Sequence, residues 1–151
     1  MSIQALSHIA VGVRDMDRSL AFYRDVIGMH VSLDTEEELP AVGDAAPRKR
    51  RAAYLRWREG PHESFIVLDQ QLSQPPFGEP PKLFQVGTHH WGYWVDDIDV
   101  IVERAEAAGM QITLRPVQGD SAAYGEPPGK VVRSAFLQDP DGNVVQLDQR
   151  T

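Results

Sequence analysis

The chain contains one pattern twice, and this duplication constrains its fold more than any other feature. Residues 6–15 and 88–97 each carry a histidine, His8 and His90, ahead of a strand-like run that ends at an acidic residue. A helical pattern follows each run, and each copy closes with a hairpin pattern that ends in Leu-Asp-Gln, at residues 68–70 and 147–149. The sequence therefore predicts two βαβββ modules and an α+β fold.

Both copies carry the start and stop signals of a helix. The helices are expected over residues 17–27 and 98–108, where apolar residues recur at helical spacing. The apolar positions are Leu20, Tyr23, Val26 and Ile27 in the first and Ile98, Ile101, Val102 and Ala105 in the second. Asp15 or Asp17 can cap the first helix and Asp97 the second. Gly28 and Gly109 suit the left-handed residue that follows a helix end.

Each copy ends in a predicted hairpin, formed by residues 53–57 with 64–70 and by residues 134–137 with 144–149. The dipeptide Asp141-Gly142 is a strong turn signal, because glycine accepts a positive φ. Residues 71–87 contain two proline pairs and are expected to connect the copies. We expect one domain over residues 1–151, with module one at about 1–72, a linker at about 73–86 and module two at about 87–151.

Two further segments fall outside the repeat. Residues 34–51 carry an acidic run and a basic run, and we expect a loop whose charges are solvated. Residues 119–129 are rich in glycine and proline and are expected to form a flexible flap over a site.

The composition excludes several classes of function. No cysteine is present, which rules out disulfides, thiolate metal sites and cysteine nucleophiles. The net charge of −7 disfavours a nucleic-acid partner, since phosphates require a basic surface. No run approaches the roughly 18 apolar residues of a membrane helix. We therefore expect a cytoplasmic protein, with neither nucleic acid nor membrane as a partner.

The assembled motifs resemble the vicinal oxygen chelate superfamily, which includes glyoxalase I, bleomycin-resistance proteins and extradiol dioxygenases. The resemblance rests on the His8 strand, residues 19–29, the His90 strand with residues 95–97, and the closing run 136–143. It covers nearly the whole chain. It implies that the two modules form a cupped mixed sheet around a site and that the protein is a homodimer. The fold alone does not fix the function, because its members perform different chemistries.

The resemblance also implies positions for a metal site. The family's metal ligands lie on the first and last strands of each module, which places the corners at His8, Val67, His90 and Gln146. Imidazole binds Fe, Mn, Ni, Co or Zn. Val67 has no donor atom and Gln146 offers a neutral amide oxygen, so the expected ligands of a divalent metal ion are His8, His90 and Gln146. The absence of a carboxylate at these corners disfavours glyoxalase I itself.

Neighbouring positions on the same strands supply carboxylates that can point toward the same site. Residues two apart on a strand share a face, so Asp148 accompanies Gln146 and Asp69 accompanies Val67. His89 is expected to point to the face opposite His90.

Aromatic and basic residues complete the candidate site. Trp94 shares the strand parity of His90, and with Arg56 and Tyr54 it is a candidate for substrate binding. A guanidinium group suits a carboxylate or phenolate oxygen because it is a planar fork of donors. His90 and Tyr124 are the candidate catalytic residues.

Three functions remain open at this point. The first is a metal-dependent lyase, isomerase or ring-cleaving dioxygenase that holds two adjacent oxygens of a small substrate on the ion. The second is a metal-free protein that binds an antibiotic or a pathway intermediate. The third is a metal-free enzyme in which His8, His90 or Tyr124 transfers protons.

Overall fold

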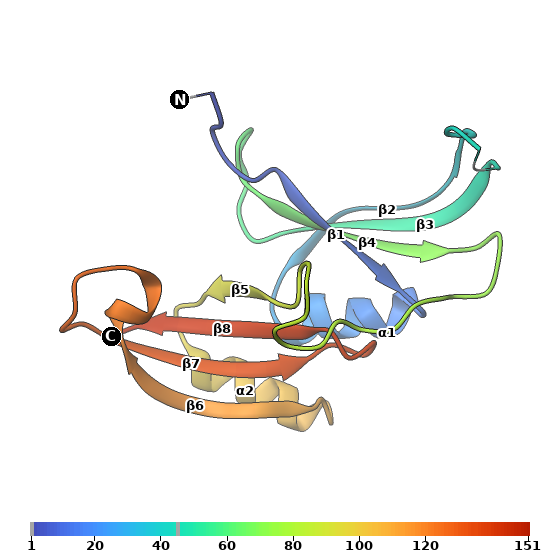
Figure 1. Ribbon diagram of the computed structural model, residues 1–151. Coiled ribbons are helices and arrows are strands. Elements are labelled where there is room, and N and C mark those ends of the chain that lie inside the picture. The colour runs from blue at the N-terminus through green and yellow to red at the C-terminus, as the bar shows by residue number, and fades with distance from the viewer. Residues whose placement is uncertain (1, 45) are drawn as a thin grey trace. The chain divides into compact units, whose positions relative to one another are not determined.

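The computed structural model describes residues 2–44 and 46–151. It divides into two compact units, Met1–Gly78 and Glu79–Thr151. Each unit contains a four-stranded sheet of mixed strand direction with a helix, which confirms the predicted α+β class (Figure 1). The boundary between the units falls inside the proline-rich segment that we expected to connect the modules.

The two units have the same order of elements and the same sheet topology. In the first unit the sheet order is β1-β4-β3-β2, and in the second it is β5-β8-β7-β6. The outer strand that begins each unit runs parallel to the last strand, and the remaining pairs are antiparallel. The first unit consists of β1 (His8–Val13), α1 (Met16–Leu20), η1 (Ala21–Val26), β2 (His30–Leu39), β3 (Arg48–Arg56) and β4 (Phe65–Gln71). The second consists of β5 (Trp91–Trp94), α2 (Ile98–Ala107), β6 (Ile112–Asp120), η2 (Ser121–Tyr124), β7 (Val131–Gln138) and β8 (Val144–Arg150).

α1 continues directly into the π-helix η1, and this continuous segment and α2 each begin and end at the predicted signals. The Asp15 side chain accepts a hydrogen bond from a backbone N–H of α1, and Asp97 does the same for α2. Gly28 and Gly109 have φ values of 94° and 67°, as expected after a helix end. All the predicted apolar positions are buried except Ile27, which is half-buried. Of the helices that the structure describes, none has the length and apolar character needed to cross a membrane.

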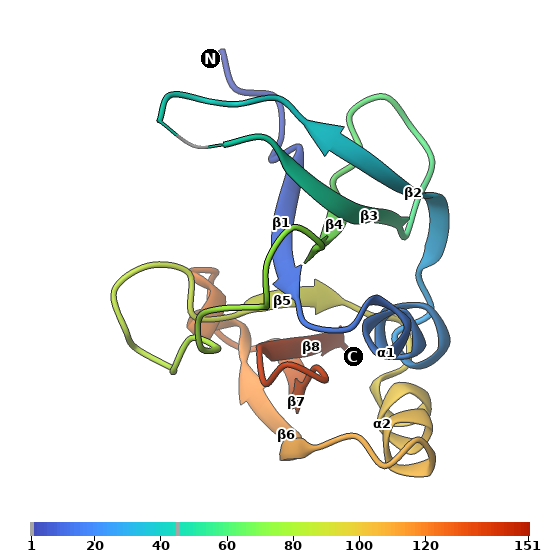
Figure 2. The same ribbon diagram turned by 90° about the vertical axis from the view of Figure 1, so that its right-hand side faces the viewer.

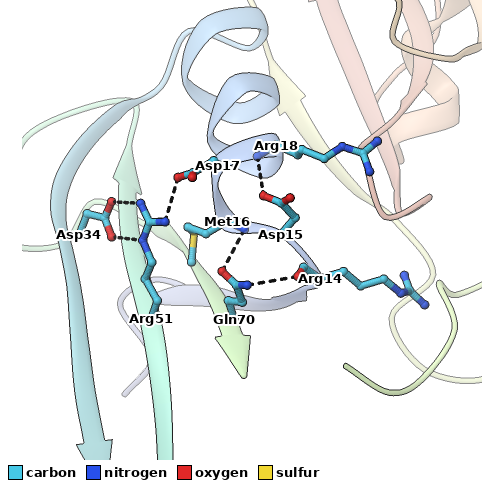
Figure 3. Close-up of polar contacts among 8 residues, drawn as sticks. All are labelled: Arg14, Asp15, Met16, Asp17, Arg18, Asp34, Arg51 and Gln70. Atoms are coloured by element: carbon cyan, nitrogen blue, oxygen red, sulfur yellow. Dashed lines mark hydrogen bonds and ion pairs between the residues drawn. The ribbon is translucent and has the colours of Figure 1, made fainter. Parts of the chain in front are cut away.

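A glutamine near the end of each unit ties the last strand to the start of the helix. Gln70 Oε1 accepts a hydrogen bond from the Met16 backbone N–H at 3.1 Å, and its Nε2 donates to the Arg14 carbonyl at 3.3 Å (Figure 3). Gln149 makes the same two bonds, to the N–H of Ile98 at 3.4 Å and to the carbonyl two residues earlier at 2.7 Å. The matching Leu-Asp-Gln endings thus have matching structural roles in the two units.

The prediction that residues 34–51 form a loop was wrong for residues 34–39 and 48–51, which are parts of strands. Their acidic and basic runs lie on β2 and β3, which pair in an antiparallel hairpin that can be followed in Figure 2. The ion pairs Glu36–Lys49, Glu37–Arg50 and Asp34–Arg51 span 2.6 to 2.7 Å. Opposite charges on neighbouring strands attract, so these runs stabilise the hairpin. Arg51 also binds Asp17 of α1 at 2.8 Å, so it links the hairpin to the helix (Figure 3).

Residues 119–129, expected to be a flexible flap, form a compact loop around η2. The Asp120 carboxylate accepts hydrogen bonds from the backbone N–H groups of Ala122 and Gly129, and these bonds lower its pKa. The buried Ser121 hydroxyl donates to the Pro127 carbonyl at 2.7 Å. These local bonds fix the position of Tyr124 at the end of η2.

One buried hydroxyl yields a prediction about stability. Ser19 is fully buried in α1, and its Oγ has no hydrogen-bond partner among the described residues. An unsatisfied buried hydroxyl costs about 1–3 kcal/mol, and alanine favours a helix. We therefore expect Ser19→Ala to raise the free energy of unfolding by about 1 kcal/mol in urea denaturation. Ser121→Ala is the matched control, because that buried hydroxyl is bonded, and it should lower the same quantity by about 1 kcal/mol. Destabilisation by Ser19→Ala would contradict the argument.

Candidate functional site

In each unit the helix packs against one face of the sheet, and we call the opposite face the open face. In the second unit, Gln149 contacts α2, so Val145 and Leu147 share that covered side. Gln146 and Asp148 alternate with them and belong to the open face of the second unit. Their cross-strand neighbours on this face are Gly92, Trp94, Ser134 and Phe136.

Asp148 is the centre of a polar cluster on this face. Only 5% of the residue is exposed, yet its carboxylate accepts hydrogen bonds from three neutral side chains. Tyr124 Oη donates to Oδ1 at 2.5 Å and Ser134 Oγ donates to the same atom at 2.7 Å. Gln146 Nε2 donates to Oδ1 at 2.8 Å and to Oδ2 at 3.0 Å. No cation pairs with this carboxylate in the described part of the chain, so these hydrogen bonds alone compensate its burial.

These contacts fix the orientation of Gln146. Its amide nitrogen is held by Asp148, since a carboxylate can only accept from it. Its Oε1 has no hydrogen-bond partner among residues 2–44 and 46–151. Gly92 lies opposite Gln146, and a Cβ added there would lie 3.3 Å from Asp148 Oδ2. The cluster thus combines a positioned amide acceptor with a strand position that carries no side chain.

Tyr124 connects the polar cluster to an aromatic surface. Its ring centroid lies 5.1 Å from that of Trp94, which is 52% exposed. The Arg150 guanidinium lies 4.1 Å above the Trp94 ring and also pairs with Glu126 at 2.6 Å. Partial burial raises the pKa of Tyr124, and its bond to Asp148 raises it further. Tyr124 is therefore a protonated hydrogen-bond donor at neutral pH and does not act as a base.

His90 lies just before β5, with its ring centroid 6.3 Å from that of Phe136. The expectation that His89 points away from His90 was wrong. Their Nδ1 atoms are 2.8 Å apart and their rings 4.6 Å apart, because the two residues precede the strand and escape its alternation.

The open face of the first unit brings together three other candidates around Phe65. The His8 ring stacks on Phe65 with centroids 5.2 Å apart, and the Arg56 guanidinium lies 4.4 Å from the Phe65 ring centroid. The Tyr54 and Phe65 centroids are 6.1 Å apart, and Tyr54 is also the cross-strand neighbour of the buried Val67. His8 belongs to this unit, and His90 and Gln146 to the other, so the convergence of all three stays a prediction.

Asp69, two residues beyond Val67, lies on the open face of the first unit but is engaged in an ion pair. Arg50 binds it at 2.5 Å and binds Glu37 at 2.6 Å. Burial raises the pKa of Asp69 despite the opposing effect of Arg50. Its carboxylate is therefore compensated by a cation, in contrast to that of Asp148.

The donor groups at the family's metal corners do not fit a divalent ion well. Val67 offers no donor, and Gln146 offers a neutral oxygen. No cluster of three or more histidine, cysteine or acidic side chains suited to a metal exists among the residues that the structure describes. A carboxylate ligand would neutralise part of the charge of a divalent ion, and neither Val67 nor Gln146 does so, which lowers the expected affinity relative to a corner set that includes carboxylates.

Sequence reasoning did not identify Ser134 or Phe65 as parts of the two clusters. Ser134 is the cross-strand neighbour of Asp148, and Phe65 is that of His8. Their strands were predicted, but the register that pairs them was not. The Asp141-Gly142 turn could have supplied the register of Ser134 with Asp148, but no local signal supplies that of β1 with β4, because those strands are far apart in the sequence.

The model of the Glyoxalase/Bleomycin resistance protein/Dioxygenase superfamily matches residues 5–147. A probable chloroplastic lactoylglutathione lyase of Arabidopsis thaliana is 30% identical over 95% of this chain, which spans only 35% of that protein's length. The lactoylglutathione lyase of Haemophilus influenzae is 28% identical, with 93% of this chain and 88% of that protein covered. A glyoxalase family protein from Bacillus cereus shares the fold, with a TM-score of 0.80, 17% identity, and 99% and 96% of the two chains covered.

Proposed function

This chain belongs to the Glyoxalase/Bleomycin resistance protein/Dioxygenase superfamily, and we propose that it binds a small molecule on the open face of its second unit without a tightly held metal ion. The observation that carries this proposal is the orientation of Gln146. Asp148 holds the amide nitrogen, which leaves Oε1 as an acceptor for a hydroxyl or N–H group of a ligand. Such a positioned polar group beside aromatic side chains is typical of small-molecule sites.

The side chains around Gln146 have complementary roles in this proposal. Trp94 and Tyr124 supply an exposed aromatic surface for the apolar part of the ligand. The absence of a side chain at Gly92 leaves space for the Asp148 carboxylate that orients Gln146, since a Cβ there would lie 3.3 Å from Asp148 Oδ2. Asp148 acts through Gln146 and Tyr124, because it orients both.

Metal content is the direct test of metal independence. We expect protein purified without chelators to contain less than about 0.1 equivalent of Fe, Mn, Ni, Co or Zn by plasma mass spectrometry, since the corners are neutral. We also expect Zn²⁺ or Ni²⁺ to leave the melting temperature unchanged in a chelator-free buffer. One equivalent of a retained metal that is lost in His90→Ala would refute the proposal.

A metal-dependent lyase that chelates two substrate oxygens is the second candidate. Two observations favour it, namely the relatives named lactoylglutathione lyase and the matching positions of His8 and His90. Conversion of the methylglyoxal–glutathione adduct, followed by ultraviolet absorbance with each metal, separates the two candidates. We expect no turnover above the blank; turnover that a chelator abolishes would establish the lyase.

The homodimer and the cytoplasmic location stay predictions. Light scattering on a size-exclusion column tests the first, and fractionation of the source cells tests the second.

A further inference from the structure

We propose that the open face of the first unit contains a binding site for an organic carboxylate, in which Arg56 is the anchoring cation. This goes beyond the function proposed for the second unit and rests only on contacts within the first. The site consists of Arg56, His8 and Tyr54, which surround the ring of Phe65.

Arg56 differs from the other arginines in a comparable environment. Among the described residues the half-buried arginines are Arg50, Arg51, Arg56 and Arg133. Arg50, Arg51 and Arg133 each bind a carboxylate at 2.5 to 2.7 Å. Arg56 has no acidic partner in the described part of the chain, and its guanidinium lies 4.4 Å from the centre of the Phe65 ring. In a chain with a net charge of −7, a half-buried arginine without a carboxylate is conspicuous.

The contact with Phe65 orients the Arg56 guanidinium so that it can bind a planar anion. A guanidinium on an aromatic ring is attracted to the ring face and loses part of its conformational freedom. Its N–H groups remain available in a fixed fork, which matches the two oxygens of a carboxylate. Because the pairing is already oriented, binding costs less side-chain entropy than it does at a solvent-exposed arginine.

His8 and Tyr54 supply the remaining polar groups. His8 Nδ1 contacts Ser7 Oγ at 2.9 Å, and its Nε2 has no hydrogen-bond partner among residues 2–44 and 46–151. Ala10, the next residue of β1 on the same face, has a small side chain and lies opposite Val67, so β1 adds little bulk beyond His8.

The neighbouring groups favour a carboxylate over a phosphate ester. The site has one permanent cation, Arg56, beside the uncharged rings of Tyr54 and Phe65, which is suited to a single negative charge. A phosphate dianion usually requires several cations or a set of backbone N–H groups. Aromatic contacts from Phe65 and Tyr54 further favour a ligand with a flat apolar body.

Benzoate is a suitable probe, with benzyl alcohol as the neutral analogue of similar shape. Titrations of the ¹⁵N-labelled full chain should show benzoate binding at least about tenfold more tightly than benzyl alcohol, since one oriented ion pair contributes about a factor of ten. The shifted amides should include His8, Tyr54 and Phe65. Equal affinities, or shifts confined to residues 79–151, would overturn the proposal.

Variants identify the cation. Arg56→Gln should abolish the preference for benzoate, and Arg56→Lys should keep only part of it, because lysine lacks the planar fork. Arg58→Gln is the matched control, since Arg58 is exposed and lies two residues away. Equal losses in Arg56→Gln and Arg58→Gln would reduce the effect to overall charge and refute the site. The amide spectrum of each variant shows whether it is folded.

Discussion

Asp148→Ala is expected to lower the free energy of unfolding of the second unit by about 3–4 kcal/mol, since it breaks a buried polar network. The carboxylate accepts hydrogen bonds from Tyr124, Ser134 and Gln146, and it is 5% exposed. Its removal leaves these three donors without their acceptor and opens a small cavity. Guanidinium denaturation followed by tryptophan fluorescence measures the effect, because Trp94 lies beside Tyr124.

The duplication supplies the control for this prediction. Asp69 is the counterpart of Asp148 in the first unit, but its side chain is 26% exposed and pairs with Arg50, which keeps Glu37 as a second partner. Asp69→Ala should therefore cost only about 1 kcal/mol, as expected for a partly screened ion pair. Similar decreases in the free energy of unfolding in the two variants would mean that the hydrogen bonds around Asp148 contribute no more stability than the ion pair of Asp69.

Gln146→Glu is expected to destabilise the protein by about 2–3 kcal/mol at pH 8 and by much less at pH 4.5. The amide nitrogen lies 2.8 and 3.0 Å from the two oxygens of Asp148, so the new carboxylate replaces a donor with a like charge. Two carboxylates at this distance cannot both ionise easily, so one of the pair keeps its proton and has a raised pKa in the folded state.

The sign of the pH dependence follows from that retained proton. Between the unfolded pKa of about 4.3 and the raised folded pKa, the folded variant binds more protons than the unfolded chain. The variant therefore loses stability relative to the wild type as the pH rises through this interval, and the loss is complete above it. Urea denaturation of both proteins from pH 4.5 to 8 measures the difference. Gln111→Glu, at an exposed position, should show a difference within about 0.5 kcal/mol that hardly changes with pH.

The repeat in the sequence predicted the architecture well because its signals are local. A cap, an apolar stripe and a glycine fix each helix, and the matching ends of β4 and β8 fix the topology. The prediction for the 34–51 segment failed because it depended on how two strands pair. Each run of like charges, taken alone, is typical of solvent-exposed surface. Only the strand register shows that Glu37 lies opposite Arg50, so that the two runs form ion pairs.

The candidate residues were more difficult to interpret than the fold. Gln146 was correctly placed on the last strand, but its role depends on which way the amide points, and Asp148 decides that through hydrogen bonds. Arg56 was a candidate from its chemistry alone, whereas its lack of a carboxylate is visible only when every neighbour has been placed. Which side chains form hydrogen bonds or ion pairs with each other depends on the three-dimensional fold, and the sequence pattern does not specify it.

The hydrogen bonds by which Gln70 and Gln149 connect the last strand of each half to its helix have an evolutionary consequence. Each glutamine joins the first helical turn to the last strand of the same half, so a half carries the information for its own closure. A half exchanged with that of a second chain would keep every one of these bonds. Recombination between duplicated copies can therefore exchange halves while each half retains its internal register.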